Sequence, residues 1–195
     1  MSDAAPPAII GTAGHVDHGK TTLVHRLTGV QLDRLPEEQE RGITIQLGFT
    51  AAELDGQRVA FIDVPGHERL VRTMVAGAAG IDAVLLCVSA LDGVMPQTIE
   101  HVGICDALGV KQGVVALTQC DRVDAELLEL ARADVEDLVA GTFLASAPIV
   151  AVSSVSGEGI EALTAELAAL RPTVRKSDGL FRLPIDRSFQ RPGFG

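Results

Sequence analysis

The chain has 195 residues, 47% of them hydrophobic and 22% charged, which fits one globular domain and excludes a disordered or fibrous protein. A net charge of −10 and the lack of tryptophan and tyrosine argue against a basic or aromatic nucleic-acid surface. No apolar run could span a bilayer, the N-terminus lacks a secretory signal, and the three cysteines show no paired spacing, so we expect a cytoplasmic protein with reduced thiols and no membrane partner.

Short aliphatic runs, which are typical of buried strands, alternate with helical patterns along the chain. The predicted strands cover residues 8–13, 59–64, 81–90, 113–118 and 148–153. The predicted helices cover residues 20–28, 68–79, 97–108, 125–140 and 160–170. Pro96 stands where a helix would begin, and Gly109 and Gly141 where helices would end. This alternation predicts an α/β fold with a mainly parallel sheet.

One hairpin interrupts the alternation. Residues 46–54 and 57–64 flank Asp55-Gly56, which is a strong signal for a two-residue turn between antiparallel strands. We therefore predict a mixed sheet of about six strands with one antiparallel strand and helices on both faces.

The segment Gly14–Thr21 matches the phosphate-loop pattern G-x-x-x-x-G-K-[ST] between a predicted strand and a predicted helix. Such a loop turns its N–H groups toward a phosphate, Lys20 adds a positive charge, and the Thr21 hydroxyl is a magnesium ligand. His15 and His18 have no cysteine or carboxylate partner at zinc-site spacing, and an exposed position on this loop accounts for them without a metal. The fold class predicted is that of a P-loop NTPase.

Two further segments carry polar groups toward this loop. Asp63 ends a predicted strand, where a carboxylate would support magnesium, and Gly66 and His67 follow it. The Gly66 N–H can approach a γ-phosphate, and His67 is placed to orient an attacking water. Thr44 lies in a loop that could bring its hydroxyl to magnesium. The acidic run before that loop is equally compatible with a solvated turn, and the Pro-Gly after Asp63 with an ordinary turn.

The segments GHVDHGKTTL, RGITI, DVPGHE and GVMPQT together resemble the translational GTPases, such as elongation factor Tu. The segments LDRLPEEQERGITIQLGF and FRLPIDRSFQRPGFG resemble, more narrowly, the selenocysteine-specific elongation factors. The similarity extends from about Ile9 to Gly195. It implies an enzyme that hydrolyses GTP to GDP and phosphate, with magnesium, and that acts as a monomer delivering selenocysteinyl-tRNA to the ribosome at recoded stop codons.

The resemblance also implies roles for individual residues. His67 would be catalytic, within a gate formed by Val16 and Ile43. Magnesium would be bound by Thr21, Thr44 and Asp63. The nucleotide would be bound by His15, Val16, Asp17, His18, Gly19, Lys20, Thr21, Thr22, Gly66, Thr118, Gln119, Asp121, Ser153, Ser154 and Val155.

Base identity depends on Thr118-Gln119-Cys120-Asp121, where the general GTPase pattern is Asn-Lys-x-Asp. The Asp121 carboxylate can accept from N1–H and N2–H of guanine, which adenine does not offer. Thr118 and Gln119 replace the usual asparagine and lysine, so we expect weaker binding and faster exchange, and slower GDP release in Gln119→Lys. A plain strand end in a protein that binds another base remains the alternative reading. Near Ser153, the main chain would read the guanine O6.

We expect a GTP-binding domain in residues 1–171, a linker in 172–179 and, in 180–195, the first strand of an incomplete β-barrel domain. The alternatives to selenocysteine delivery are a related tRNA-delivering GTPase, such as an initiation factor subunit or a general elongation factor, and a truncated relic without activity.

Overall fold

The structure, a computed structural model, describes residues 6–32, 47–64 and 80–172. In this part of the chain six strands form one sheet in the order β2-β3-β1-β4-β5-β6. The strands are β1 (Ala8–Ala13), β2 (Gly48–Leu54), β3 (Gln57–Asp63), β4 (Ala83–Ser89), β5 (Gly113–Thr118) and β6 (Ile149–Ala151). The helices are α1 (Lys20–Thr28), α4 (Pro96–Ala107), α5 (Ala125–Val139) and α6 (Ile160–Ala169), with a short 3-10 helix, η2 (Cys120–Arg122).

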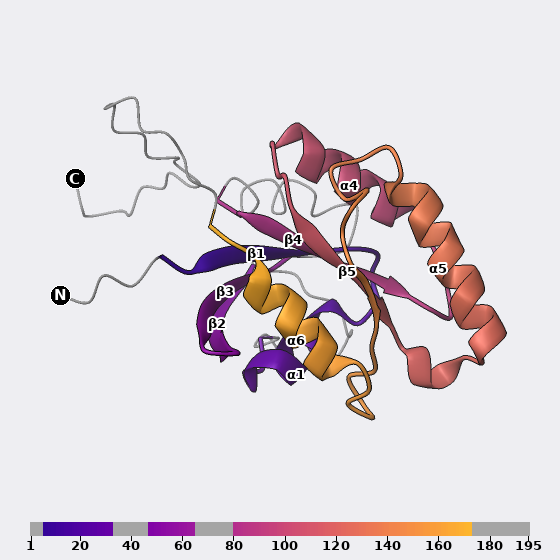
Figure 1. Ribbon diagram of the computed structural model, residues 1–195, viewed down its shortest axis with the longest axis horizontal. Coiled ribbons are helices and arrows are strands. Elements are labelled where there is room, and N and C mark those ends of the chain that lie inside the picture. The colour runs from indigo at the N-terminus through magenta and orange to yellow at the C-terminus, as the bar shows by residue number, and fades with distance from the viewer. Residues whose placement is uncertain (1–5, 33–46, 65–79, 173–195) are drawn as a thin grey trace, which may run out of the picture.

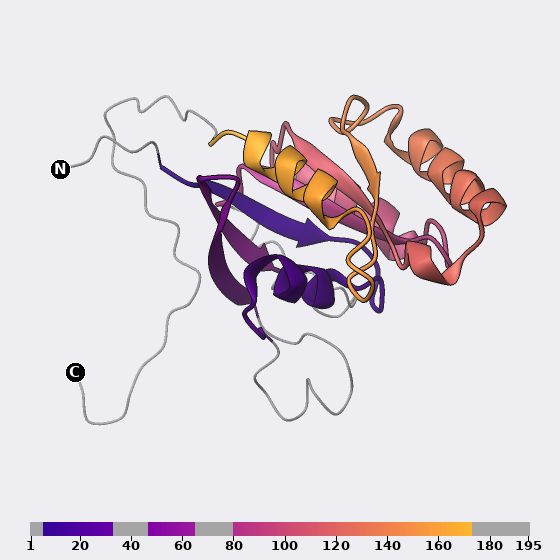
Figure 2. The same cartoon turned by 60° about the horizontal axis from the view of Figure 1, so that its bottom comes forward.

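Helices cover both faces of the sheet (Figure 1). Strand residues alternate between two hydrophobic clusters, as the pleat of a strand requires. Leu85 of β4 packs in the cluster that includes Leu23 of α1 and Leu163 of α6. Leu86, the next residue, packs in the opposite cluster with Val135 of α5. Figure 2 shows α1 and α5 on opposite sides of the strands. Burial on both faces explains why the central strands are continuous apolar runs.

The predicted hairpin is present. β2 and β3 are antiparallel, with Leu54 opposite Gln57 across the turn. Asp55 and Gly56 have φ values of 47° and 74°, the left-handed conformation that both central residues of a type I′ turn adopt. The other neighbouring strands are parallel, so the prediction of a mixed, mainly parallel sheet is confirmed.

The predicted elements agree closely with the observed ones. The helix predicted from residue 97 begins at Pro96, because proline suits the first helical position. The strands predicted over residues 81–90 and 148–153 are shorter, and the sequence did not predict η2. The predicted helix over residues 68–79 and the predicted strand over residues 180–195 lie outside the described residues.

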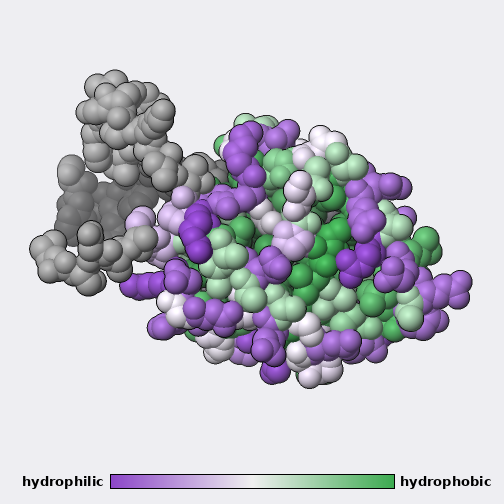
Figure 3. All heavy atoms as spheres, viewed as in Figure 1, coloured by the Kyte–Doolittle hydropathy of each residue, from purple (hydrophilic) through white to green (hydrophobic). Residues whose placement is uncertain are grey.

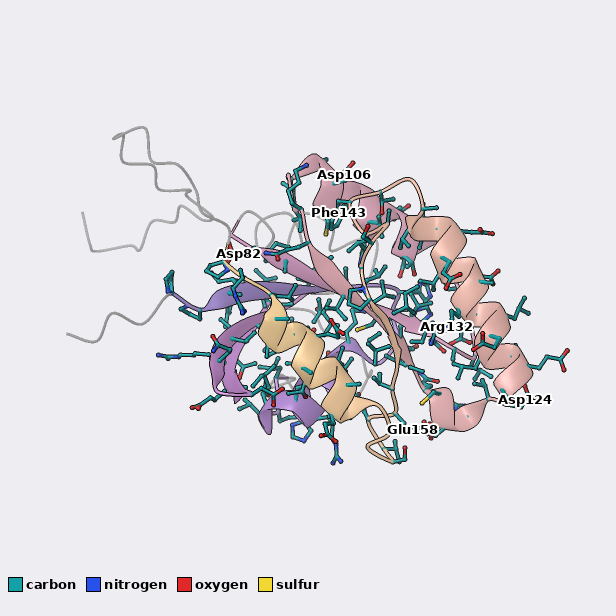
Figure 4. The ribbon with its side chains drawn as sticks, viewed as in Figure 1. Asp82, Asp106, Asp124, Arg132, Phe143 and Glu158 are labelled. Carbon is teal, nitrogen blue, oxygen red and sulfur yellow. The ribbon has the colours of Figure 1, made fainter. Side chains whose placement is uncertain are left out.

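The strand order brings the site together. β1 lies between β3 and β4 and is parallel to both. After β1 the chain adds β2 and β3 on one side of it, and then β4, β5 and β6 on the other side. Ligands of open α/β sheets bind at such a switch point, beyond the carboxyl ends of the strands. Asp82 lies at the amino end of β4, away from these carboxyl ends, while Glu158 lies in the loop before α6 (Figure 4).

Hydrophilic and apolar residues are interspersed over the face shown in Figure 3. No helix in the described ranges is long and apolar enough to cross a membrane. The thiols of Cys87, Cys105 and Cys120 are free and buried. Burial raises the pKa of Cys87 to about 12 and that of Cys105 to about 11, so both thiols stay protonated near neutral pH.

Candidate functional site

The phosphate-loop segment connects the end of β1 to the start of α1. Gly14 has φ of 126°, and a Cβ there would lie 2.1 Å from the carbonyl oxygen of Cys87, so only glycine fits. Asp17 and Gly19 also have positive φ, 62° and 74°. Gly19 precedes α1 without a side-chain cap. The N–H groups of the first turn have no partner within a helix, and together with the helix dipole they suit a phosphate.

Lys20 lies along the inside of this loop. Its side chain is buried, and Nζ donates to the carbonyl oxygen of His15 at 2.6 Å. Burial lowers the pKa of Lys20 from its ordinary value, and the carboxylates of Asp63 and Asp17 act in the opposite direction. The ammonium group is thus held beside the loop whose N–H groups would surround a phosphate.

Asp63 ends β3 as predicted and is completely buried. One carboxylate oxygen accepts from the Thr12 hydroxyl at 2.8 Å, and the other accepts from the Thr21 hydroxyl at 2.6 Å. Thr12 Oγ1 in turn accepts from the Val64 N–H at 2.9 Å. A threonine hydroxyl that donates to a carboxylate presents its oxygen as an acceptor, which is the arrangement a hard cation needs. The two predicted ligands Thr21 and Asp63 are therefore adjacent.

Two side chains of helix α4 accept hydrogen bonds from main-chain N–H groups of the phosphate-loop segment. The Gly14 N–H donates to Nδ1 of His101 at 3.0 Å, and the Val16 N–H donates to Oε1 of Gln97 at 3.3 Å. Sequence reasoning did not assign a role to either side chain. The available signal was their spacing, because residues four apart share one face of a helix that begins at Pro96.

His18 departs from the expectation of an exposed loop histidine. The residue is only 1% exposed, and its ring lies close to the Cys87 main chain. Its ring packs edge-on against His15, with ring centroids 5.2 Å apart. Burial, followed by the nearby His15, lowers the pKa of His18 to about 4. The loop passes close to the main chain of β4, since a Cβ at Gly14 would lie 2.1 Å from the Cys87 carbonyl oxygen.

These burial effects predict a loss of stability in mild acid. The pKa of His101 is also lowered to about 4, mainly by burial, so both rings are neutral in the folded chain and bind a proton more readily when it unfolds. Their stabilisation is present above the ordinary histidine pKa of about 6.5 and is lost as the pH falls toward 4. At pH 5 we expect a loss of up to about 2 kcal/mol per histidine, measured by urea unfolding.

The variant that tests the role of His101 is His101→Gln, since glutamine keeps an acceptor for the Gly14 N–H but cannot be protonated. Its unfolding free energy should fall less between pH 7.5 and 5 than that of the unchanged chain. His25→Gln alters an exposed residue of α1 and should leave the dependence as it was. Equal pH dependence in all three proteins would contradict the assignment to His101.

The predicted base-binding segment follows β5 and lies against the phosphate-loop segment. The Thr118 hydroxyl donates to the carbonyl oxygen of His18 at 2.9 Å, and Gln119 Nε2 donates to the carbonyl oxygen of Asp17 at 3.1 Å. Thr118 therefore supports the phosphate-loop segment through its hydroxyl. Gln119 has φ of 59°, after which η2 places Asp121 at the surface.

The predicted segment Ser153–Val155 lies beside the base-binding segment Thr118–Asp121. The N–H of Cys120 donates to the carbonyl oxygen of Val152 at 3.3 Å. The Ser153 side chain is buried, and its Oγ accepts from the N–H groups of Val155 and Ser156 at 3.2 and 3.0 Å. Gly159 closes this loop, since a Cβ there would lie 1.9 Å from the Ala151 carbonyl oxygen. The Ser153 hydroxyl thus holds this turn in place. The Val155 side chain that follows it is 85% exposed.

The structure thus brings most of the predicted nucleotide-binding residues into one region. Hydrogen bonds join the phosphate-loop segment to Asp63 and to Thr118 and Gln119. A main-chain bond joins Cys120 of the base-binding segment to Val152, the residue before Ser153. Thr22 is exposed on α1. The predicted residues Thr44, Gly66 and His67, and Ile43 of the predicted gate, lie outside the described residues.

A family model described as the elongation factor Tu GTP binding domain matches residues 6–173. The chain belongs to the elongation factor Tu GTP-binding domain family. This family consists of GTP-binding domains of translational GTPases, enzymes that hydrolyse GTP. The match covers every described element of the sheet and the four described helices.

Particular relatives of this GTP-binding domain are similar over nearly its whole length. A selenocysteine-specific elongation factor of Desulfomicrobium baculatum is 54% identical over 193 residues, which are 97% of this chain and 30% of that protein. The protein of the same name from Escherichia coli K12 is 45% identical over 188 residues, which are 96% of this chain and 31% of the relative.

The fold is also found among solved structures. The crystal structure of a bacterial selenocysteine-specific elongation factor, EF-Sec, superposes with a TM-score of 0.78 and 42% sequence identity, over 84% of this chain and 28% of that one. The prediction of a P-loop GTPase fold is thereby confirmed. The chain spans about 30% of the length of the two selenocysteine-specific elongation factors named above.

Proposed function

We propose that this chain is the GTPase part of a selenocysteine-specific elongation factor, which delivers selenocysteinyl-tRNA to the ribosome at recoded stop codons. The observation that carries the proposal is the 54% identity to a protein of that name over 97% of the chain. We also propose that the protein acts as a monomer in the cytoplasm and that residues 1–171, 172–179 and 180–195 are a GTPase domain, a linker and the first strand of a β-barrel.

The geometry supports GTP binding by the segment between β1 and α1. The loop N–H groups and Lys20 would surround the β- and γ-phosphates, since the positive φ values let the backbone curl and Lys20 is already held against the loop. Asp121 would accept from the guanine N1–H and N2–H at the carboxyl end of β5. Main-chain groups near Ser153 would meet the guanine O6.

Magnesium fits this site. Thr21, Thr44 and Asp63 would hold it, and Asp63 also orients the Thr21 hydroxyl through the observed 2.6 Å hydrogen bond. When bound, the ion neutralises charge on the phosphates. His67 would hold the attacking water near the γ-phosphate. Val16 and Ile43 would keep that imidazole away until the ribosome repositions it, so that hydrolysis waits for codon recognition.

The test is filter binding of selenocysteinyl-, seryl- and initiator-tRNA to the protein at its full natural length, with GTP and separately with GDP. We expect retention of selenocysteinyl-tRNA with GTP at concentrations at which the other two are not retained. Preference for initiator tRNA would overturn the proposal in favour of an initiation factor subunit, and failure to bind GTP would indicate an inactive relic.

A further inference from the structure

Two side chains of the base-binding segment are joined to each other and to the phosphate loop. Nε2 of Gln119 donates to the carbonyl oxygen of Asp17 at 3.1 Å. Nη1 of Arg122, at the end of η2, donates to Oε1 of the same amide at 2.8 Å. Both ends of the Gln119 amide are therefore occupied, one by an acceptor and one by a donor, and this sets which way round the amide lies.

This arrangement ties the base-binding segment to the loop through consecutive residues. Thr118 holds the carbonyl oxygen of His18, and Gln119 holds that of Asp17, the preceding residue. Thr118 is buried, whereas Gln119 is partly exposed and Arg122 exposed. The outer contact therefore depends on a flexible neutral amide in contact with water. A hydrogen bond from a charged donor is stronger than one between neutral groups, so Arg122 reduces the freedom of that amide.

We propose that Arg122 is a positioning residue for nucleotide retention, which acts through Gln119. A lysine at position 119 would reach a loop carbonyl with its own charged group. Here the amide of Gln119 makes the contact, and the guanidinium of Arg122 supplies the positive charge and fixes the amide. This inference rests on the proposed guanine-nucleotide binding, because release of a nucleotide held by both segments requires that they separate. Arg122 thus sets how fast GDP leaves.

The experiment is a double-mutant cycle on release of fluorescent mant-GDP, followed by stopped flow after addition of excess GDP. In the protein with Gln119, Arg122→Ala should release GDP about 3- to 10-fold faster, the loss of one charge-assisted contact at an exposed site. In Gln119→Lys, which should itself release GDP more slowly, Arg122→Ala should have less than about a twofold effect, because a lysine side chain has no acceptor for Arg122.

Matched variants separate this role from general effects of charge and folding. Arg58→Ala removes an exposed positive charge in the β2–β3 hairpin, at the opposite end of β3 from Asp63, and should leave GDP release unchanged. Arg122→Lys keeps a charged donor and should restore most of the slow release. The melting temperature without nucleotide should change little in Arg122→Ala, since the side chain is exposed.

Equal acceleration by Arg122→Ala in both backgrounds would overturn the inference, because Arg122 would then act independently of Gln119. No acceleration beyond that of Arg58→Ala would overturn it as well. Failure of the unchanged protein to bind mant-GDP in preference to mant-ADP would instead contradict guanine-nucleotide binding. Should Arg122→Ala fold poorly, the cycle is completed with Arg122→Gln. Its uncharged donor should give faster GDP release than Arg122 when residue 119 is glutamine and nearly the same release when it is lysine, and equal acceleration in both backgrounds would overturn the inference.

Discussion

The Asp121→Asn variant is expected to lose affinity for GDP and GTP by about 10²- to 10⁴-fold and to gain affinity for xanthine nucleotides. The carboxylate of Asp121 offers two acceptors to the N1–H and N2–H donors of guanine. An asparagine offers one acceptor and one donor, so its NH₂ group faces a donor and a hydrogen bond is left unmade. Xanthine has a carbonyl oxygen where guanine has its amino group, and the asparagine donor then has a partner.

The measurement is competition of GDP, XDP and ADP against a fluorescent nucleotide. Asp121 is exposed, so Asp121→Asn should melt close to the unchanged protein without nucleotide. Asp124→Asn is the matched control. Asp124 is also exposed and caps α5 by accepting from the Leu127 N–H at 2.9 Å, which asparagine can also do. Unchanged GDP affinity in Asp121→Asn would mean that this segment does not read the base.

The second large effect is expected for His67→Ala. Ribosome-stimulated GTP hydrolysis should fall by about 10²- to 10³-fold, while GTP affinity changes by less than about twofold. A residue that orients the attacking water acts mainly in the transition state, so its loss appears in turnover and not in binding. Val64, three residues before His67, is buried and its N–H donates to Thr12 Oγ1, which in turn donates to Asp63.

Single-turnover hydrolysis with programmed ribosomes and equilibrium binding of mant-GTP give the two quantities separately, using the full-length protein. His25→Ala, an exposed substitution in α1, is the control and should change neither. A loss of GTP affinity as large as the loss of turnover would instead assign His67 a structural role in the nucleotide site.

The local features of the site were predictable because each depends on residues close together in the chain. The phosphate loop is recognised by eight consecutive residues whose glycines allow positive φ, and Gly14 and Gly19 adopt it. Asp55-Gly56 specifies a tight turn by itself. Asp63 was placed correctly because an acidic residue that ends a buried apolar run lies at the edge of the sheet where parallel strands meet the phosphate loop.

Contacts between distant segments were not predictable in the same way. Whether His101 reaches Gly14 depends on β4 lying next to β1, and that order is set by packing on both sheet faces, not by any local pattern. The burial of His18 has the same origin, since the loop passes close to the main chain of β4. The sequence alone therefore predicted neither the contact of His101 with Gly14 nor the burial of His18.

The sequence by itself determined the phosphate loop, the strands and helices, the hairpin, and Asp121 as the base-reading candidate. The first three follow from spacing, periodicity and turn chemistry within short windows, and Asp121 follows from its place in the segment that corresponds to the general GTPase pattern Asn-Lys-x-Asp. Only the tertiary structure decided that Thr118 donates to the loop carbonyl of His18, 100 residues earlier, and that Gln119 donates to that of Asp17, 102 residues earlier. A side-chain hydrogen bond across such a separation exists only where strand order brings two loops to the same edge of the sheet, and strand order is a property of the packed whole.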